Sequence, residues 1–237
     1  MTAIGGPLFA ATGPRYTPGP TADTMLCKPW CEQGAITSPG GAPSASSATG
    51  DKVKMDTNER LLALDKRTLV GMLEDQAKNW LAHDGLWFQA VERHHGMPSA
   101  IALDREAWID FTRIEARRIM ERHGIRPGGG LDALATALDY RLYALLNRQS
   151  IHRLDDRTLR FEMNECRVQA ARHRKGLSDF PCKPVGLAEY AYFAHTIDPR
   201  IRTRAIACPP DPHPDSFHCA WVFTLEAEPI PEGDVLS

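Results

Sequence analysis

The spacing of apolar residues changes near residue 150, and this change constrains the fold more than any other feature of the chain. Before that point, apolar side chains recur every three or four positions over residues 67–95 and 104–124, as on one face of a helix. A third stretch repeats the pattern over residues 131–145. Three helices are therefore expected, with Gly96 and Pro98 ending the first and Asp104 capping the second.

After residue 150 the pattern becomes that of strands. Residues 151–154 and 158–163 are expected to pair around a short turn, and RIRTRAIAC and SFHCAWVFTLE to form two strands joined by a proline-rich loop. The segments NECRVQAARHRKG and PVGLAEYAYFAHTID have helical character. The last strand is expected to bury one alternating set of side chains, namely Phe217, Cys219, Trp221, Phe223 and Leu225. The fold class that follows is α+β, a helical N-terminal half followed by a small antiparallel sheet with two helices.

Composition divides the chain into three parts. Residues 1–55 are rich in Gly, Pro, Ser, Thr and Ala without apolar periodicity, which predicts a disordered low-complexity tail. Residues 56–228 are expected to form a single domain, and residues 229–237 a C-terminal tail. Helical sequence begins directly after Met55, so the natural start is either Met1 or Met55. The CKPWC pair lies in the N-terminal tail, where no framework preorganises metal ligands.

The charge balance argues against several classes of partner. A net charge of −2 and a pI of about 6.5 give no reason to expect nucleic acid or an anionic membrane. No apolar run approaches the roughly 18 residues that span a bilayer, and the start lacks the basic region of a signal peptide. Six cysteines are too few for a disulfide scaffold in 237 residues. A cytoplasmic protein with a small-molecule partner is expected, and its oligomeric state stays open.

Four cysteines, Cys166, Cys182, Cys208 and Cys219, carry the main chemical expectation. Cys166 falls in the first turn of a predicted helix and Cys182 just before another, where backbone N–H groups stabilise a thiolate. Thiolates bind Zn²⁺ or attack electrophiles, so the four are candidate zinc ligands and Cys166 is also a candidate nucleophile. No Cys-x-x-Cys pair occurs among them, and cysteines that merely fill the core are the third interpretation.

The loop between the last two predicted strands contributes a further candidate, His213, which lies among four prolines. Prolines lower the entropy lost on ordering, so the loop is suited to hold a ligand or a general base, or is simply a rigid exposed turn. Arg202 alternates with Arg200 and Arg204 along a predicted strand. It is a candidate contact for a carboxylate substrate, and a solvated face is the alternative.

A second group of polar residues lies in the helical half. Asp84 falls within the apolar stripe of the first helix beside His83 and Trp87, and Glu115 is placed similarly on the second helix. These four residues are candidates to line a polar pocket between the helices that binds a small ligand. The alternative is a buried Asp–Arg pair under tryptophans.

Several segments resemble an uncharacterised family of bacterial cytosolic proteins over about residues 56–226: WLAHDGLWF, FEMNECRVQAARHRKGL, DFPCKPVG and IDPRIRTRAIACPPDPHPDSFHCAWVF. That family in turn resembles the L-2-amino-thiazoline-4-carboxylate hydrolases and, more remotely, the 4-vinyl reductase ligand-binding domains. The likeness to the hydrolases rests on Cys166 after a strand, Cys182 before a helix, and a closing pattern made by Asp215, His218, Cys219, Trp221 and Phe223.

The resemblance to the hydrolases implies opening of a cyclic C–N or C–S compound, and the one to the vinyl reductase domains implies a cysteine-rich zinc site and ligand sensing. We therefore expect a small-molecule hydrolase that acts on a polar, carboxylate-bearing compound through Cys166, His213 and Asp84. If zinc is held, its bound water would be the nucleophile. The alternative is a non-enzymatic binding or sensor domain with a structural zinc held by cysteines.

Overall fold

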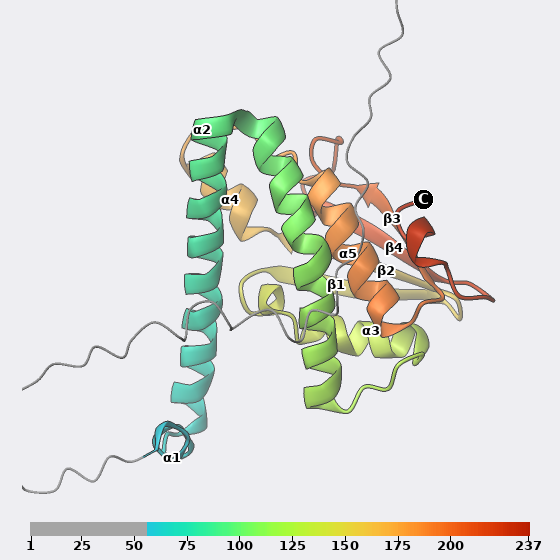
Figure 1. Cartoon of the computed structure of the whole chain (residues 1–237), viewed down its shortest axis with the longest axis horizontal. Coiled ribbons are helices and arrows are strands. Elements are labelled where there is room, and N and C mark those ends of the chain that lie inside the picture. Colours follow the sequence, from blue (N-terminus) through green and yellow to red (C-terminus); the bar gives the residue numbers. More distant parts are fainter. Residues whose placement is uncertain (1–55) are drawn as a thin grey trace, which may run out of the picture. The chain divides into compact units, whose positions relative to one another are not determined.

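The computed structural model describes residues 56–237, so the expected N-terminal tail and the CKPWC pair lie outside the described residues. Figure 1 shows the elements, which are α1 (Thr57–Leu62), α2 (Lys66–His123), α3 (Gly130–Asp139), η2 (Leu142–Leu145), β1 (Arg148–Asp155), β2 (Thr158–Glu165), α4 (Arg167–Arg174), α5 (Lys183–Ile197), β3 (Ile201–Ala207), β4 (Cys219–Leu225) and η3 (Glu232–Asp234). No helix in this part of the chain is both long and apolar enough to cross a membrane.

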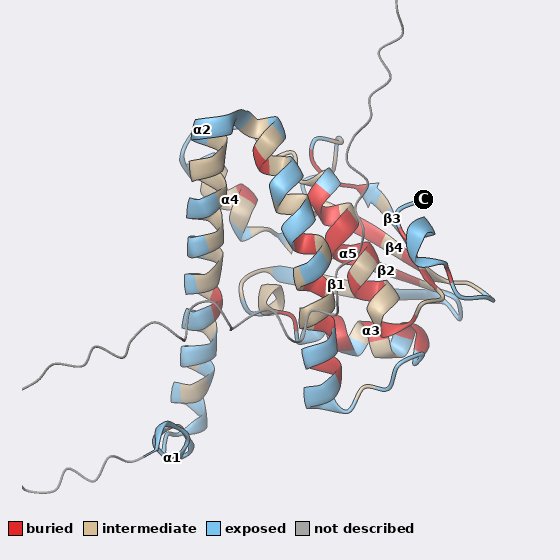
Figure 2. Ribbon diagram, viewed as in Figure 1, coloured by how far each residue is buried: buried red, intermediate tan, exposed pale blue. Residues whose placement is uncertain are grey.

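The four strands form one antiparallel sheet in the order β1-β2-β4-β3. Its central strands bury alternate side chains, with Phe161 and Met163 of β2 in the same core as Trp221 and Phe223 of β4. Helix α5 packs on the sheet and α2 packs on α5, so the buried residues concentrate between them (Figure 2). The α+β fold, with a helical N-terminal region followed by an antiparallel sheet, is confirmed.

Phe217 does not share the core with Trp221, and this part of the strand prediction was wrong. It packs in a small separate cluster with Ala207 and Ala220. The reason is that β4 begins only at Cys219, so the alternation of a strand does not extend back to Phe217.

One bend divides α2, the longest helix of the helical half, into two segments. Helix α2 begins at an Asp65 cap, whose carboxylate accepts hydrogen bonds from the backbone of Arg67 and Thr68. The helix breaks at Gly96, whose φ of 80° and ψ of 163° belong to a region that only glycine adopts readily, and then resumes at once. Pro98 therefore lies in the first turn of the second segment, where its missing N–H is harmless, and does not end a helix. Asp104 is likewise inside the helix, not at its cap.

The third helix is shorter than expected because of Arg141. Helix α3 ends at Asp139, and Arg141 then adopts an extended conformation with φ −68° and ψ 151°. This conformation places its guanidinium group in the core, where it pairs with Glu115 and Glu189. A tertiary ion pair thus overrides the local helical pattern of the leucines.

Residues 229–237, set apart by sequence as a tail, pack on the domain. The backbone N–H of Ile230 donates to Pro199, and the Ile230 carbonyl lies 2.9 Å from His195 Nε2. Val235 is also buried, and Glu232 pairs with Arg113 at 2.6 Å. The domain therefore extends to the end of the chain.

Candidate functional site

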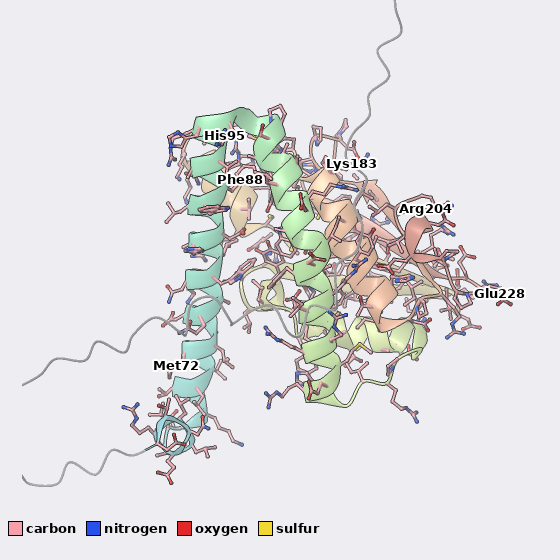
Figure 3. The ribbon with its side chains drawn as sticks, viewed as in Figure 1. Met72, Phe88, His95, Lys183, Arg204 and Glu228 are labelled. Atoms are coloured by element: carbon pink, nitrogen blue, oxygen red, sulfur yellow. The ribbon has the colours of Figure 1, made fainter. Side chains whose placement is uncertain are left out.

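A cavity of about 890 Å³ lies between the two segments of α2 on one side and α4, α5 and the sheet on the other. Ligand sites for small molecules typically have about 300–1,000 Å³, so this cavity is large enough for one. Aromatic side chains make up much of its wall, among them Phe88, whose ring meets that of Phe180 from the other side at 4.9 Å. Figure 3 labels Phe88 on the first segment of α2, between Met72 and the bend near His95.

All four cysteines singled out by sequence line this one cavity. The sulfur atoms of Cys182 and Cys208 are 3.6 Å apart. The amide of Gln169 donates to the Cys182 sulfur at 3.7 Å, and the indole N–H of Trp221 donates to the Cys219 sulfur at 3.3 Å. Elements distant in sequence thus converge on a sulfur-rich wall, since Cys166 precedes α4, Cys182 precedes α5 and the other two flank the proline-rich loop.

Two of the thiols in this wall, those of Cys166 and Cys208, are held in their neutral form. Burial raises the pKa of Cys166 to about 12, and this effect outweighs the backbone hydrogen bonds at the start of α4. Hydrogen bonds with Cys182 and Cys219 raise the pKa of Cys208 far above its ordinary value. The expected thiolate at the helix N-terminus is therefore absent from Cys166, because desolvation is the larger effect.

The fit of the cysteines to zinc is partial. Four thiolates around Zn²⁺ at about 2.3 Å would be roughly 3.8 Å from one another, which is close to the Cys182–Cys208 separation of 3.6 Å. In the described part of the chain, however, no three Cys, His, Asp or Glu side chains converge on a metal position. The residues as they stand offer a two-thiol contact and not a complete zinc site.

Three carboxyl groups line the cavity from α2, those of Asp84 and Glu92 on the first segment and that of Asp104 on the second. Asp84, a candidate from sequence, has a raised pKa because of burial, partly offset by the neighbouring His83. Asp104, which sequence reasoning treated only as a cap, has its pKa raised to about 7 by burial and then by the charges of Asp84 and Glu189. A carboxyl group with such a pKa holds or releases a proton near neutral pH, which suits acid–base chemistry.

Glu115 serves the fold and does not line the cavity. Its carboxylate accepts from Arg141 Nε at 2.9 Å, and Arg141 Nη1 lies 2.7 Å from Glu189 Oε1. The guanidinium group also lies 5.4 Å from the ring centre of Tyr190 and 4.7 Å from that of Phe193. The alternative expected from sequence was a buried Asp–Arg pair, whereas the buried pair in the structure joins Glu115 to Arg141, a residue that sequence reasoning did not consider.

His213 does not line the cavity. Its Nε2 lies 3.8 Å from Asp179, which also contacts His173 at 2.6 Å, and its ring centre is 5.7 Å from that of His218. The proline-rich loop that carries His213 is fastened to the start of α5, because Lys183 pairs with Asp211 at 2.8 Å; Figure 3 labels Lys183 at this end of the helix. The loop therefore presents its histidines outside the wall of cysteines.

His83 and Trp87 line a smaller hollow of about 370 Å³ with Trp80 and Asp84. Trp87 is 68% exposed, so this hollow is a surface feature of α2. Asp84 belongs to both spaces and connects the pocket expected from sequence to the larger cavity.

Arg202 lies on the sheet away from the cavity and is already paired. Its guanidinium group contacts Glu226 at 3.3 Å and the carbonyl of Ser237 at 3.2 Å. Arg200, which lies in the turn just before β3, is bound to Asp198 at 2.7 Å. The anion-binding role proposed for this strand is therefore not favoured by the geometry.

Sequence reasoning missed part of the cavity wall. Glu189, Tyr143 and Asp104 line it. Tyr190, for which the sequence left both a core and a pocket position open, also lines it. A signal did exist for Glu189, because GLAEYAYF places an acidic residue inside an otherwise apolar helix, as HDGLWF does for Asp84. Nothing local marks Asp104, whose role depends on the bend at Gly96.

Comparison with known proteins gives a family but no activity. The sequence profile described as "Family of unknown function (DUF6125)" matches residues 62–225, a range that includes both segments of α2, the whole sheet and the four cysteines of the cavity. No curated protein matches the chain, and no solved structure does.

Proposed function

The chain therefore belongs to this family of unknown function, and we propose that it is a small-molecule enzyme of the hydrolase type. Its substrate would be a polar, carboxylate-bearing compound with a C–N or C–S bond to be opened. The observation that carries this proposal is the single cavity in which four thiols and the carboxyl groups of Asp84 and Asp104 meet. A nucleophile, a proton carrier and space for a ligand are thereby present at one place.

Cys166 is the proposed nucleophile. Its thiol would add across a C=N or C=O bond of the substrate, forming a C–S bond, and its proton would pass to the substrate nitrogen or oxygen. Asp104, with a pKa of about 7, and Asp84 are the proposed proton carriers. They take the role that sequence reasoning gave to His213, because they line the cavity with Cys166. Collapse of this adduct would break the C–N or C–S bond of the substrate, and the departing nitrogen or sulfur would take a proton from one of the two carboxyl groups. Water would then attack the carbon still bound to Cys166, release the product and restore the thiol.

The carboxylate of the substrate has candidate partners at the edge of the cavity. Arg93, Arg167, Arg174 and Lys175 line it and are exposed to solvent. Exposed cations attract an anionic ligand and orient it without a large desolvation penalty. These residues replace Arg202 as the proposed anion contacts.

We also propose that the protein works in a reducing compartment such as the cytoplasm. Cys182 and Cys208 lie 3.6 Å apart as free thiols, together with two other free cysteines. Thiols so close to one another persist where disulfides are kept reduced.

The test is turnover. The full chain is incubated with L-2-amino-thiazoline-4-carboxylate, and ring opening is followed by mass spectrometry as the gain of one water. We expect Cys166→Ser to lower kcat at least about a hundredfold. Cys182→Ser, which alters the same wall but no step of the reaction, is the matched control and should keep most of the activity. Undiminished turnover in Cys166→Ser would refute the proposed nucleophile.

A second candidate function is a binding or sensor domain with zinc held by cysteines. It is favoured by the Cys182–Cys208 contact, and it requires side-chain rotation to bring Cys166 and Cys219 to the same point. Elemental analysis of the anaerobically purified full chain distinguishes it. About one zinc per chain, lost in Cys208→Ala, would favour this candidate.

A further inference from the structure

We propose that the ligand of this cavity carries a positively charged nitrogen, as an ammonium or amidinium group, which is held by the carboxyl groups of Asp84 and Asp104. The inference rests on the proposed function, because it takes the cavity as the ligand site. It adds the chemical class of the group that this part of the site recognises.

The half-buried carboxyl groups that line the cavity outnumber the cationic side chains in the protein core that could pair with them. Asp84 and Asp104 form no ion pair within residues 56–237, and the charge of Asp84 helps to raise the pKa of Asp104. Glu189 has Arg141 as a partner but shares it with Glu115, so one guanidinium group faces two carboxylates. A ligand that fills the cavity displaces water and leaves this negative charge less screened. A cation on the ligand would compensate the charge, whereas a neutral group would not.

The aromatic wall favours the same class of ligand. Trp108 stacks with Tyr143 at 5.8 Å between ring centres, and Tyr190 lies 4.8 Å from Trp221. All four rings line the cavity. The faces of such rings are electron-rich and attract ammonium and guanidinium-like groups, most strongly where water is excluded.

Tyr190 supplies a polar group that lacks a partner in the protein. Its side chain is only 4% exposed, it lines the cavity, and its hydroxyl forms no hydrogen bond within the described residues. Because this side chain lines the cavity, a bound ligand is in a position to supply the partner of its hydroxyl. The N–H groups of an amidinium or ammonium ion are donors that this oxygen can accept.

The distribution of charge around the cavity also predicts the orientation of a bound ligand. Exposed cations, Arg93, Arg167, Arg174 and Lys175, line the cavity where it meets solvent, whereas Asp84 and Asp104 are half-buried. A ligand with a carboxylate would place it toward the exposed cations and its charged nitrogen toward the aspartates. The site is therefore complementary to a zwitterion.

Binding of a cation should depend on pH in a defined sense. Asp104 faces Asp84 from the other segment of α2, Glu189 and Tyr190 from α5, and Tyr143 from η2, while Arg141 lies behind these rings. Since the pKa of Asp104 is about 7, the carboxylate form grows as pH rises from 6 to 8. A cation should consequently bind more tightly over this interval and release a proton as it binds.

The test is isothermal titration calorimetry of the full chain with benzamidine and with benzamide, its neutral analogue of nearly the same shape. At pH 8 we expect benzamidine to bind at least about tenfold more tightly than benzamide. Asp84→Asn and Asp104→Asn should each weaken benzamidine binding about tenfold and leave benzamide unchanged. Glu106→Gln, an exposed position on the same helix, is the matched control and should change neither affinity.

Equal affinities for the two probes, no heat with either, or full benzamidine binding in the Asp84→Asn, Asp104→Asn double variant would each overturn the inference. Failure of the proposed hydrolase function has a different readout. Loss of that function is judged by turnover in Cys166→Ser, whereas selective binding of benzamidine does not depend on the thiol. A protein that selects the cation but has no turnover would keep this inference and refute the hydrolase.

Discussion

Asp104 couples the stability of the protein to pH. Its pKa is about 7 instead of 3.8, first because of burial and then because of Asp84 and Glu189. The folded chain therefore binds more protons than the unfolded chain between about pH 4 and pH 7, and the free energy of unfolding falls as pH rises through this window. The loss amounts to at most about 4 kcal/mol.

Asp104→Asn should remove this dependence. Urea unfolding is expected to show a variant that is somewhat more stable than the wild type at pH 5, where the unfolded Asp104 is already mostly ionised, and more stable by a larger margin at pH 8. Glu106→Gln, exposed on the same helix, should leave the pH dependence intact. An Asp104→Asn variant that changes stability by the same amount at both pH values would contradict the raised pKa.

Gly186 determines how closely α5 approaches the sheet beneath the cavity. A Cβ atom at this position would lie 2.9 Å from Cζ2 and 3.1 Å from Cη2 of Trp221, which is fully buried. Gly186→Ala should therefore destabilise the protein by about 1–3 kcal/mol through overpacking. Thermal unfolding measures the effect, with Gly71→Ala as the control, because a Cβ at Gly71 meets no atom within 4 Å. A Gly186→Ala variant as stable as that control would show that the contact is loose.

At the residue scale, the four cysteines and Asp84 were singled out from sequence, and all five line the cavity. Cys166 and Cys182 stood near predicted helix starts, Cys208 and Cys219 flanked a predicted hairpin loop, and Asp84 was a carboxylate in an apolar stripe. Their chemical roles stay predictions. His213, Glu115 and Arg202 do not line the cavity. Each is instead paired with a residue distant in sequence: His213 with Asp179, Glu115 with Arg141, and Arg202 with Glu226.

At the element scale, the bend of α2 brings Asp84 opposite Asp104. The bend depends on Gly96, because its backbone conformation is strained for any residue with a Cβ atom. Gly96→Ala should cost about 1–3 kcal/mol, although its Cβ would meet only Pro98 at an ordinary 3.8 Å. The same control, Gly71→Ala, should instead add up to about 1 kcal/mol through helix propensity. Urea unfolding of both variants checks the contrast; equal effects would argue that the bend is not strained.

Local sequence patterns predict which elements form but are not sufficient to predict where each element ends. Apolar spacing predicted both segments of α2, and alternation predicted the strands, since these signals are local. The end of α3 was not predictable, because it depends on Arg141 entering a core formed by α2 and α5. The packing of Ile230 and Val235 likewise needs a surface that exists only in the folded protein.

At the scale of the whole molecule, the α+β class followed from the order of the two periods, helical and then alternating. The fold class alone did not predict the cavity. Its wall draws on both segments of α2, on η2, on α4, on α5 and on the sheet, so it exists only when all of them are assembled. The central claim is that this cavity is the functional site.

Gly85 allows that claim to be tested directly. It lines the cavity, and a Cβ atom added there meets no atom within 4 Å. Gly85→Leu should therefore fill the cavity without disturbing the fold, whereas Gly71→Leu adds the same side chain to the same helix outside the cavity. The measurement is the calorimetric affinity of each full-length variant for benzamidine at pH 8. We expect Gly85→Leu to weaken binding at least about tenfold and Gly71→Leu to bind as the wild type does. Unchanged binding in Gly85→Leu would show that the cavity is not the ligand site.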